Sequence, residues 1–150
     1  MRSKQRSFVR SILFSLAAVL TLSISVANGQ TSTTPLFKDY RGIKIGMSAD
    51  EVRGKLENLQ KGNKQDFLVF SEREHAQIYY DDKSKVSAIS IDYFDAASAP
   101  APNLVLGVEL HAKDDGSMYQ LNRYPDAGYW VSYNRTAGDK PIVTITVQKM

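Results

Sequence analysis

Alternating apolar and polar residues fill most of the chain after residue 65 and predict a series of β-strands. In the clearest run, 142–148, the side chains of Val143, Ile145 and Val147 point one way and the threonines between them point the other way. The same alternation, interrupted by turn residues, predicts further strands at 67–69, 78–80, 86–93, 106–112, 118–124 and 128–134. Such half-apolar strands are typical of an antiparallel sheet with one solvated face.

A helical period replaces the alternation in one place, shortly before the first predicted strand. Ser48 is followed three residues later by Glu51, the spacing of a capping box in which each residue bonds to the backbone of the other. An apolar stripe follows at positions i, i+4 and i+7, formed by Val52, Leu56 and Leu59. These features predict a helix over 49–58. We therefore expect an α+β domain, with one short N-terminal helix packed on an antiparallel sheet of about six or seven strands.

The first 29 residues have the composition of a secretory signal peptide. Four basic residues without an acid precede an apolar run over 12–26, and small residues end the segment at 27–29. The apolar run is shorter than the roughly 20 residues that cross a bilayer, which favours cleavage over a membrane anchor. We expect cleavage to leave Gln30 as the new terminus, with cleavage after Ala27 as the near alternative. The mature protein would then be periplasmic or secreted.

The mature chain is expected to contain one domain. Residues 30–37 form a polar lead that we expect to be flexible as far as Pro35. The remainder, 38–150, is long enough to bury a hydrophobic core of its own. Within it, the stretch 96–103 is rich in alanine and proline, and because proline does not fit a central strand we interpret this stretch as a connection.

Charge and cysteine content restrict the possible partners. The whole chain has a net charge of +3, but four of its 19 Lys and Arg residues lie in the signal segment, so the mature domain with its 16 acids is close to neutral. Its basic residues are scattered, and no run of them could neutralise a line of phosphates, so nucleic acid is not an expected partner. The sequence has no cysteine, which excludes disulfides, thiolate metal sites, thiol nucleophiles and the lipid anchor of a bacterial lipoprotein. No membrane span is expected after signal cleavage.

Histidines, the usual general bases and zinc ligands, are few. His75 lies in a charged turn, and His111 alternates with Val108 and Leu110 and should point away from the core. Neither histidine has the partner at i+4 that a zinc-binding helix needs. We therefore interpret both as solvated side chains.

Other catalytic patterns are equally scarce. The acidic pairs at 81–82 and 114–115 lack the alternating ligand spacing of a calcium loop and are better explained as turn formers. The sequence contains no nucleophile elbow, no Ser-x-x-Lys with its partner motifs and no glycine-rich phosphate loop. We assign no catalytic, cofactor-binding or metal-binding residue, and we expect no cofactor.

Residues 43–56 read Ile-Lys-Ile-Gly-Met-Ser-Ala-Asp-Glu-Val-Arg-Gly-Lys-Leu, with a Gly-Met-Ser turn directly before the predicted helix. This segment resembles the entry motif of the BamE-like family of small outer-membrane-assembly lipoproteins and of the β-lactamase-inhibitor-protein-like fold that contains them. The resemblance implies a helix packed on an antiparallel sheet and a location in the cell envelope. The chain lacks the lipid-attachment cysteine of that family.

The candidate binding surface consists of five aromatic residues on two neighbouring predicted strands: Tyr119, Tyr124, Tyr129, Trp130 and Tyr133. Alternation places Tyr129 and Tyr133 on one face of their strand and Trp130 on the other. If the tyrosines face the core, Trp130 lies outside, where a large aromatic side chain usually binds something or is covered by another element. In the interpretation that we favour, Trp130 is instead the core anchor and the tyrosines lie at an edge.

These observations predict a non-catalytic, exported protein-interaction domain that binds an envelope or extracellular protein through its sheet. The alternative is a binder of a small hydrophobic or glycan ligand in the tyrosine-rich half, and a hydrolase with an unrecognised site is the third possibility. A closed apolar pocket lined by Tyr119, Tyr124 and Tyr129 would favour the ligand. A flat, exposed aromatic patch would favour the protein partner.

Overall fold

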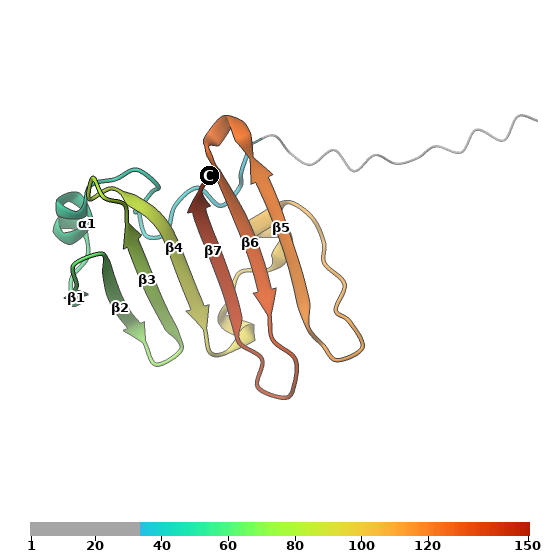
Figure 1. The fold of residues 1–150 in the computed structure, drawn as a ribbon. Coiled ribbons are helices and arrows are strands. Elements are labelled where there is room, and N and C mark those ends of the chain that lie inside the picture. The colour runs from blue at the N-terminus through green and yellow to red at the C-terminus, as the bar shows by residue number, and fades with distance from the viewer. Residues whose placement is uncertain (1–33) are drawn as a thin grey trace, which may run out of the picture.

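The computed structural model describes residues 34–150, which form seven β-strands, two α-helices and two short 3-10 helices. The strands are β1 (Leu59–Lys61), β2 (Gln65–Ser71), β3 (Glu74–Tyr80), β4 (Val86–Tyr93), β5 (Met118–Tyr124), β6 (Tyr129–Arg135) and β7 (Val143–Lys149). All seven join one sheet in the order β1-β2-β3-β4-β7-β6-β5, and every neighbouring pair is antiparallel (Figure 1). The α+β class and the antiparallel sheet are confirmed.

The last strand lies in the middle of the sheet. Strands β1 to β4 follow one another in space, and β5 to β7 do the same in the opposite direction, so that β7 pairs with β4. The connection from β4 to β5 therefore crosses two other strands, and it carries the 3-10 helix η1 (Ala96–Ser98) and the helix α2 (Pro102–Leu106). As predicted, no strand forms over 96–103. The two halves of the chain meet at the β4–β7 pair.

The predicted capping box opens helix α1 (Ala49–Lys55). The Ser48 hydroxyl accepts a hydrogen bond from the Glu51 backbone N–H at 3.3 Å, and the Glu51 carboxylate accepts one from the Ser48 backbone N–H at 2.8 Å. The helix ends three residues before the predicted Asn58, which takes a positive φ of 59°. This turn lets Leu59 pair with Leu68 as part of β1 instead of continuing the helix. Helix α1 begins at Ala49, so the prediction of an N-terminal helix was wrong.

The strand predicted at 106–112 does not form. Pro102 occupies the first turn of α2, and Gly107 ends the helix in the left-handed conformation with a φ of 76°. Val105 and Leu106 are buried from this helix, and residues 108–112 that follow carry no regular structure. Of the apolar residues that suggested a strand, Leu106 therefore reaches the core from a helix, and Val108 and Leu110 pack against the core from the irregular segment.

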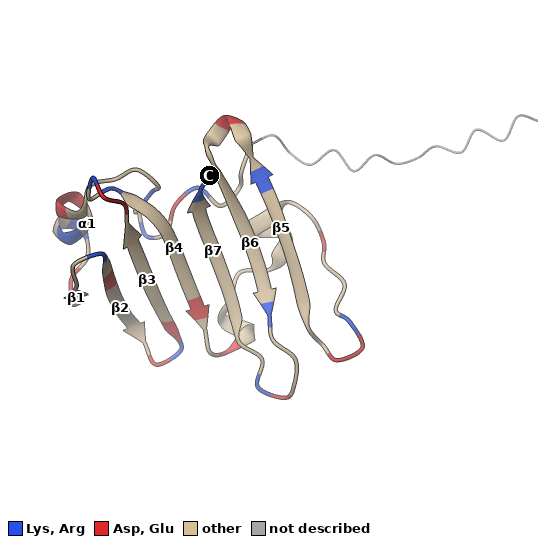
Figure 2. Ribbon diagram, in the orientation of Figure 1, with Lys and Arg blue, Asp and Glu red and all other residues tan. Residues whose placement is uncertain are grey.

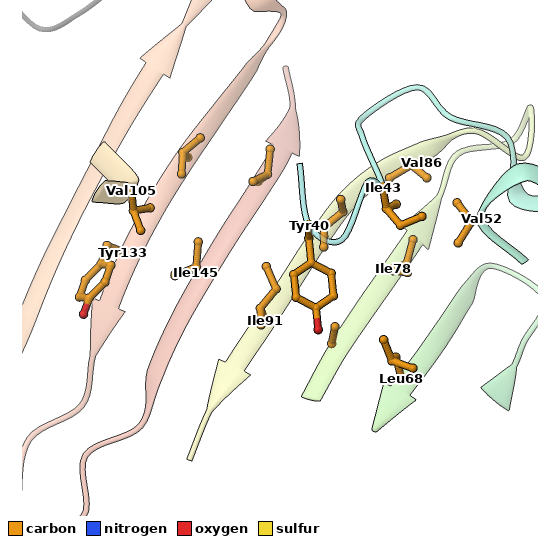
Figure 3. Close-up of a cluster of buried hydrophobic side chains, with 14 of the residues drawn as sticks. Tyr40, Ile43, Val52, Leu68, Ile78, Val86, Ile91, Val105, Tyr133 and Ile145 are labelled. Atoms are coloured by element: carbon orange, nitrogen blue, oxygen red, sulfur yellow. The ribbon is translucent and has the colours of Figure 1, made fainter. Parts of the chain in front are cut away.

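The hydrophobic core lies on one face of the sheet. It combines inward-facing strand residues such as Ile78, Ile91 and Ile145 with Val52 of α1 and Val105 of α2 (Figure 3). The segment before α1 contributes to the same core, through its buried residues Tyr40 and Ile43. Val143, Ile145 and Val147 are all buried, as the alternation in the last strand predicted.

The signal peptide predicted over 1–29 lies outside the described residues. Of the predicted flexible lead 30–37, residues 34–37 are described, and there Pro35 is buried and Phe37 packs against the core. The chain is therefore anchored from Pro35 onward. No helix within residues 34–150 has the length and hydrophobicity to cross a membrane.

Candidate binding face of the sheet

The face of the sheet opposite the core, called here the open face, is the candidate site. Within residues 34–150, the buried side chains of both α-helices belong to the core on the other face. The pairing register arranges the outward residues in three rows that run across the strands. Cross-strand neighbours in a row are close enough to act together on one ligand.

The three rows have the following members, each read from β5 to β2. The central row consists of Leu121, Ser132, Thr146, Ser90, Gln77 and Phe67. The tryptophan row consists of Arg123, Trp130, Gln148, Ala88, Tyr79 and Gln65. The histidine row consists of Tyr119, Asn134, Thr144, Asp92, His75 and Val69.

Hydroxyl and amide groups occupy the middle of the open face. The hydroxyls of Ser90 and Thr146 are 3.4 Å apart, and the Thr144 hydroxyl donates to Asp92 at 2.7 Å. Asp92 and Arg123 are the only charged members of the three rows. Figure 2 shows that the other charged residues of the sheet gather at strand ends and turns. The middle of this face is therefore polar but nearly uncharged.

A shallow hollow of about 450 Å³ lies in this polar region. It is lined by Tyr79, Ser87, Ala88, Ser90, Thr146, Gln148 and Lys149. In the tryptophan row, Tyr79 and Trp130 lie three strand spacings apart, on the order of 14 Å. Four small side chains thus form much of the lining, Tyr79 borders it on one side, and Trp130 lies beyond Gln148 in the same row.

A second group of rings lies at the β2–β3 end of the open face. The rings of Phe67 and His75 meet edge to face at 5.6 Å, and those of His75 and Phe94 at 4.7 Å. Val69 and Phe94 are each 43% exposed at this corner. His75 is half-buried between the two phenylalanines, so the expectation of a solvated side chain was wrong for it. His111 is exposed, as predicted.

The five predicted aromatic residues do not share one surface. Tyr124 and Tyr133 are buried in the core, and Tyr129 packs against that core from the same face, so these three tyrosines are not on the open face. Tyr119 is 61% exposed on the open face. Trp130 is half-buried there, so the interpretation of Trp130 as a core anchor was wrong.

The register explains the position of Trp130. Its neighbour Val131 pairs with Val147, and Tyr133 pairs with Ile145, both of which are core residues. Because side chains alternate along a strand, Trp130 must then point outward. The tyrosines do not enclose a common pocket, because Tyr119 and Tyr124 lie on opposite faces of the sheet.

Sequence reasoning missed several members of the open face, among them Tyr79, Phe67, His75 and Phe94. The alternation within β2 and β3 places Phe67 outward when Leu68 is buried, and Tyr79 outward when Ile78 is buried. The rows themselves depend on which strands are neighbours. That information is not local in the sequence.

Two acidic turns outside the open face have structural roles. The carboxylate of Asp81 accepts the backbone N–H groups of Lys85 and Lys83, each at 3.0 Å, and the first of these bonds is the main reason why its pKa lies below the ordinary value. Asp115 forms the same kind of turn with Ser117 at 2.9 Å. These acidic turns are structural, as predicted. In residues 34–150, no three His, Asp or Glu side chains are grouped so that they could hold a metal ion.

No protein-family model, no curated protein and no solved structure matches this chain. The functional argument therefore rests on the geometry and chemistry of the open face.

Proposed function

We propose that this protein is a non-catalytic, exported domain that binds a polypeptide partner on the open face of its sheet. The observation that carries the proposal is the combination of a nearly uncharged polar middle with aromatic residues on several sides, on a face that no α-helix within residues 34–150 covers. Trp130 and Tyr119 flank it on one side and Tyr79 and Phe67 on the other.

The size of the open face suits a protein partner. The six strands that carry the three rows, about 4.8 Å apart, give a width of about 24 Å, and seven residues at about 3.3 Å give a length of about 23 Å. The product, about 550 Å², is of the same order as the roughly 800 Å² that each partner buries in a standard protein interface. A single small ligand would leave most of this face unused.

The composition of the open face also supports a protein partner. The centres of protein interfaces are poor in charged residues and rich in aromatic residues. The middle of the open face is poor in charged residues, and aromatic residues lie around it. Its exposed apolar side chains lie at two places, Val69 and Phe94 at the β2–β3 corner and Tyr119 on β5, instead of lining one pocket. The export part of the proposal rests on the order of basic, apolar and small residues over 1–29. The partner is then an envelope or extracellular protein.

Photo-crosslinking from two matched positions tests the proposal. Tyr119 on the open face and Leu104 on α2 have similar exposures, 61% and 66%. Each is replaced in turn by p-benzoylphenylalanine in the full chain, and the cells that make the protein are irradiated. We expect a covalent adduct with one discrete polypeptide from position 119 and none from position 104.

A third variant tests whether the adduct depends on the residues of the central row. Thr146→Arg places a long cation in the middle of the central row without touching the core, and it should abolish the adduct from position 119. An adduct that forms equally from position 104, or one that survives Thr146→Arg, would refute binding on the open face. So would the absence of any polypeptide adduct from position 119.

A glycan ligand is the second candidate, because the hollow beside Tyr79 is lined by hydroxyl and amide groups that could hydrogen-bond sugar hydroxyls. An aromatic ring next to such groups could stack on a sugar ring. A glycan array probed with the wild-type protein and with Tyr79→Ala separates the two candidates. A glycan signal that Tyr79→Ala removes would favour this second function over the first.

A further inference from the structure

A smaller hollow of about 270 Å³ lies on the core side of the sheet, under η1 and α2, where β6 ends and β5 and β7 begin. It is lined by Ala96, Ala97, Pro102, Met118, Tyr133, Arg135 and Val143. Met118, Arg135 and Val143 are neighbours in one cross-strand row. Tyr133 and Arg135 are the lining residues with polar side-chain groups.

Within the described part of the chain, the charge of Arg135 has no partner. Its Nε atom is buried without a hydrogen bond, and none of the ion pairs or side-chain hydrogen bonds within residues 34–150 involves its guanidinium. Arg135 as a whole is half-buried, but its Nε–H group is buried, and buried polar groups are nearly always hydrogen-bonded. An unsatisfied Nε–H group in an arginine that lines a hollow therefore calls for an explanation.

Three acidic groups in this part of the fold form no ion pair with Arg135. Glu74 lies in the same cross-strand row three strands away, and it already accepts hydrogen bonds from Tyr40 at 2.8 Å and Arg41 at 2.9 Å. Asp95 caps η1 and pairs with Arg73 at 3.3 Å. Asp139, in the exposed turn between β6 and β7, forms no ion pair with Arg135 within the described part of the chain.

Tyr133 supplies a second unused donor beside Arg135. Its side chain is only 4% exposed, and no hydrogen bond to its hydroxyl is present within residues 34–150. Burial raises the pKa of this phenol, and the nearby Arg135 opposes the rise. The hydroxyl is therefore protonated at neutral pH and can donate. Tyr133 and Arg135 are two residues apart on β6, so their side chains point to the same side about 7 Å apart.

We propose that this hollow binds a small organic carboxylate with a short apolar tail. The guanidinium fork of Arg135 matches the two oxygens of a carboxylate, and the Tyr133 hydroxyl can donate to one of them. The tail would lie against Ala97, Pro102 and Met118. The volume of about 270 Å³ is just below the 300–1,000 Å³ typical of ligand pockets, so the ligand is small. This site and the open face lie on opposite sides of the sheet, so each proposal can fail without the other.

Titration with hexanoate tests the site, with hexanamide as a neutral probe of the same shape. Calorimetry or NMR chemical shifts would follow binding to the wild-type protein, to Arg135→Gln, to Tyr133→Phe and to Arg123→Gln. Arg123 is the matched control, because it is an exposed arginine on the neighbouring strand β5 but belongs to the open face. We expect saturable binding of hexanoate, at least tenfold weaker in Arg135→Gln, measurably weaker in Tyr133→Phe and unchanged in Arg123→Gln.

Folding of the variant can be checked independently. Arg135→Gln removes an unpaired cation, so its melting temperature without ligand should equal or exceed that of the wild type. Hexanoate should then raise the melting temperature of the wild type but not that of Arg135→Gln. Absence of saturation, equal binding of hexanamide, or equal losses in Arg135→Gln and Arg123→Gln would each overturn the proposal.

Discussion

Replacing Asp66 by asparagine should lower the melting temperature by about 10 °C, because this fully buried carboxylate accepts four hydrogen bonds, two of which come from Arg53 of α1. One oxygen accepts from Arg53 Nη2 at 2.9 Å and from the Gly62 backbone N–H at 3.0 Å. The other accepts from Arg53 Nε and from the Tyr80 hydroxyl, both at 2.8 Å. Each carboxylate oxygen of Asp66 thus accepts two hydrogen bonds.

An asparagine cannot reproduce this arrangement. Its side chain has one acceptor oxygen, so in either orientation its NH₂ group faces two donors, and the charge that pairs with Arg53 is lost as well. Breaking a buried ion pair costs about 3–5 kcal/mol. The Arg53 side chain is 26% exposed and water can reach it, so we expect the lower end, about 3 kcal/mol. For a domain of this size, that cost corresponds to a shift of about 10 °C.

Thermal unfolding followed by circular dichroism at pH 7 measures the effect, and Asp82→Asn is the matched control. Asp82 pairs with Lys64 at 2.9 Å, but both side chains are largely exposed, so its replacement should leave the melting temperature unchanged. If Asp66→Asn had the same melting temperature as Asp82→Asn, the buried network would not stabilise the fold as argued.

The same network predicts how this effect depends on pH. Burial alone would raise the pKa of Asp66, but the hydrogen bonds from Arg53, Tyr80 and Gly62 outweigh it and hold the pKa below the ordinary value. The stabilisation is therefore complete above the unfolded-state pKa of about 3.9 and is lost as the pH falls through the lower folded-state value. The difference between the wild type and Asp66→Asn should narrow below about pH 4. A difference that stayed constant down to pH 2 would contradict this assignment.

Two further predictions concern elements that the sequence identified. Ile145→Ala should cost roughly 2–5 kcal/mol in denaturant unfolding because Ile145 is fully buried in the central strand β7, whereas Thr144→Ala on the open face should cost less than about 1 kcal/mol. Equal losses would mean that both faces of β7 are covered. Ser48→Ala should cost about 1 kcal/mol by removing the helix cap, and Ser48→Asp should be nearly neutral, as a melting curve of each variant can show.

Local chemistry explains which parts of the fold could be predicted. The capping box needs only Ser48 and Glu51, and the faces of β7 follow from the alternation of its β-branched residues, so both were recognisable in the sequence. The end of α1 was not, because Leu59 is drawn into β1 by its pairing with Leu68, which is a tertiary contact. Helix α2 had local signals that we did not weigh, namely proline at its start and glycine just after its end.

The candidate site was less predictable than the fold. The aromatic residues Tyr119 and Trp130 were singled out from sequence, but their relation to Tyr79 and Phe67 depends on the insertion of β7 between β4 and β6. The unpaired state of Arg135 could not be predicted either. It depends on which carboxylates other parts of the chain have already engaged, and a sequence pattern does not contain that information.

The alternation within β7 separates stability from binding in a way that can be measured. Ile145 and Thr146 are adjacent residues, yet Ile145 pairs with Ile91 in the core and Thr146 pairs with Ser90 on the open face, across a sequence separation of 56 residues. Thr146→Arg should therefore abolish the adduct from position 119 and leave the melting temperature nearly unchanged. Ile145→Ala should lower the melting temperature but, at a temperature where it is still folded, keep the adduct. If each variant lost the adduct and also had a lower melting temperature, binding at the open face could not be separated from folding. The partner would then contribute to the stability of the sheet.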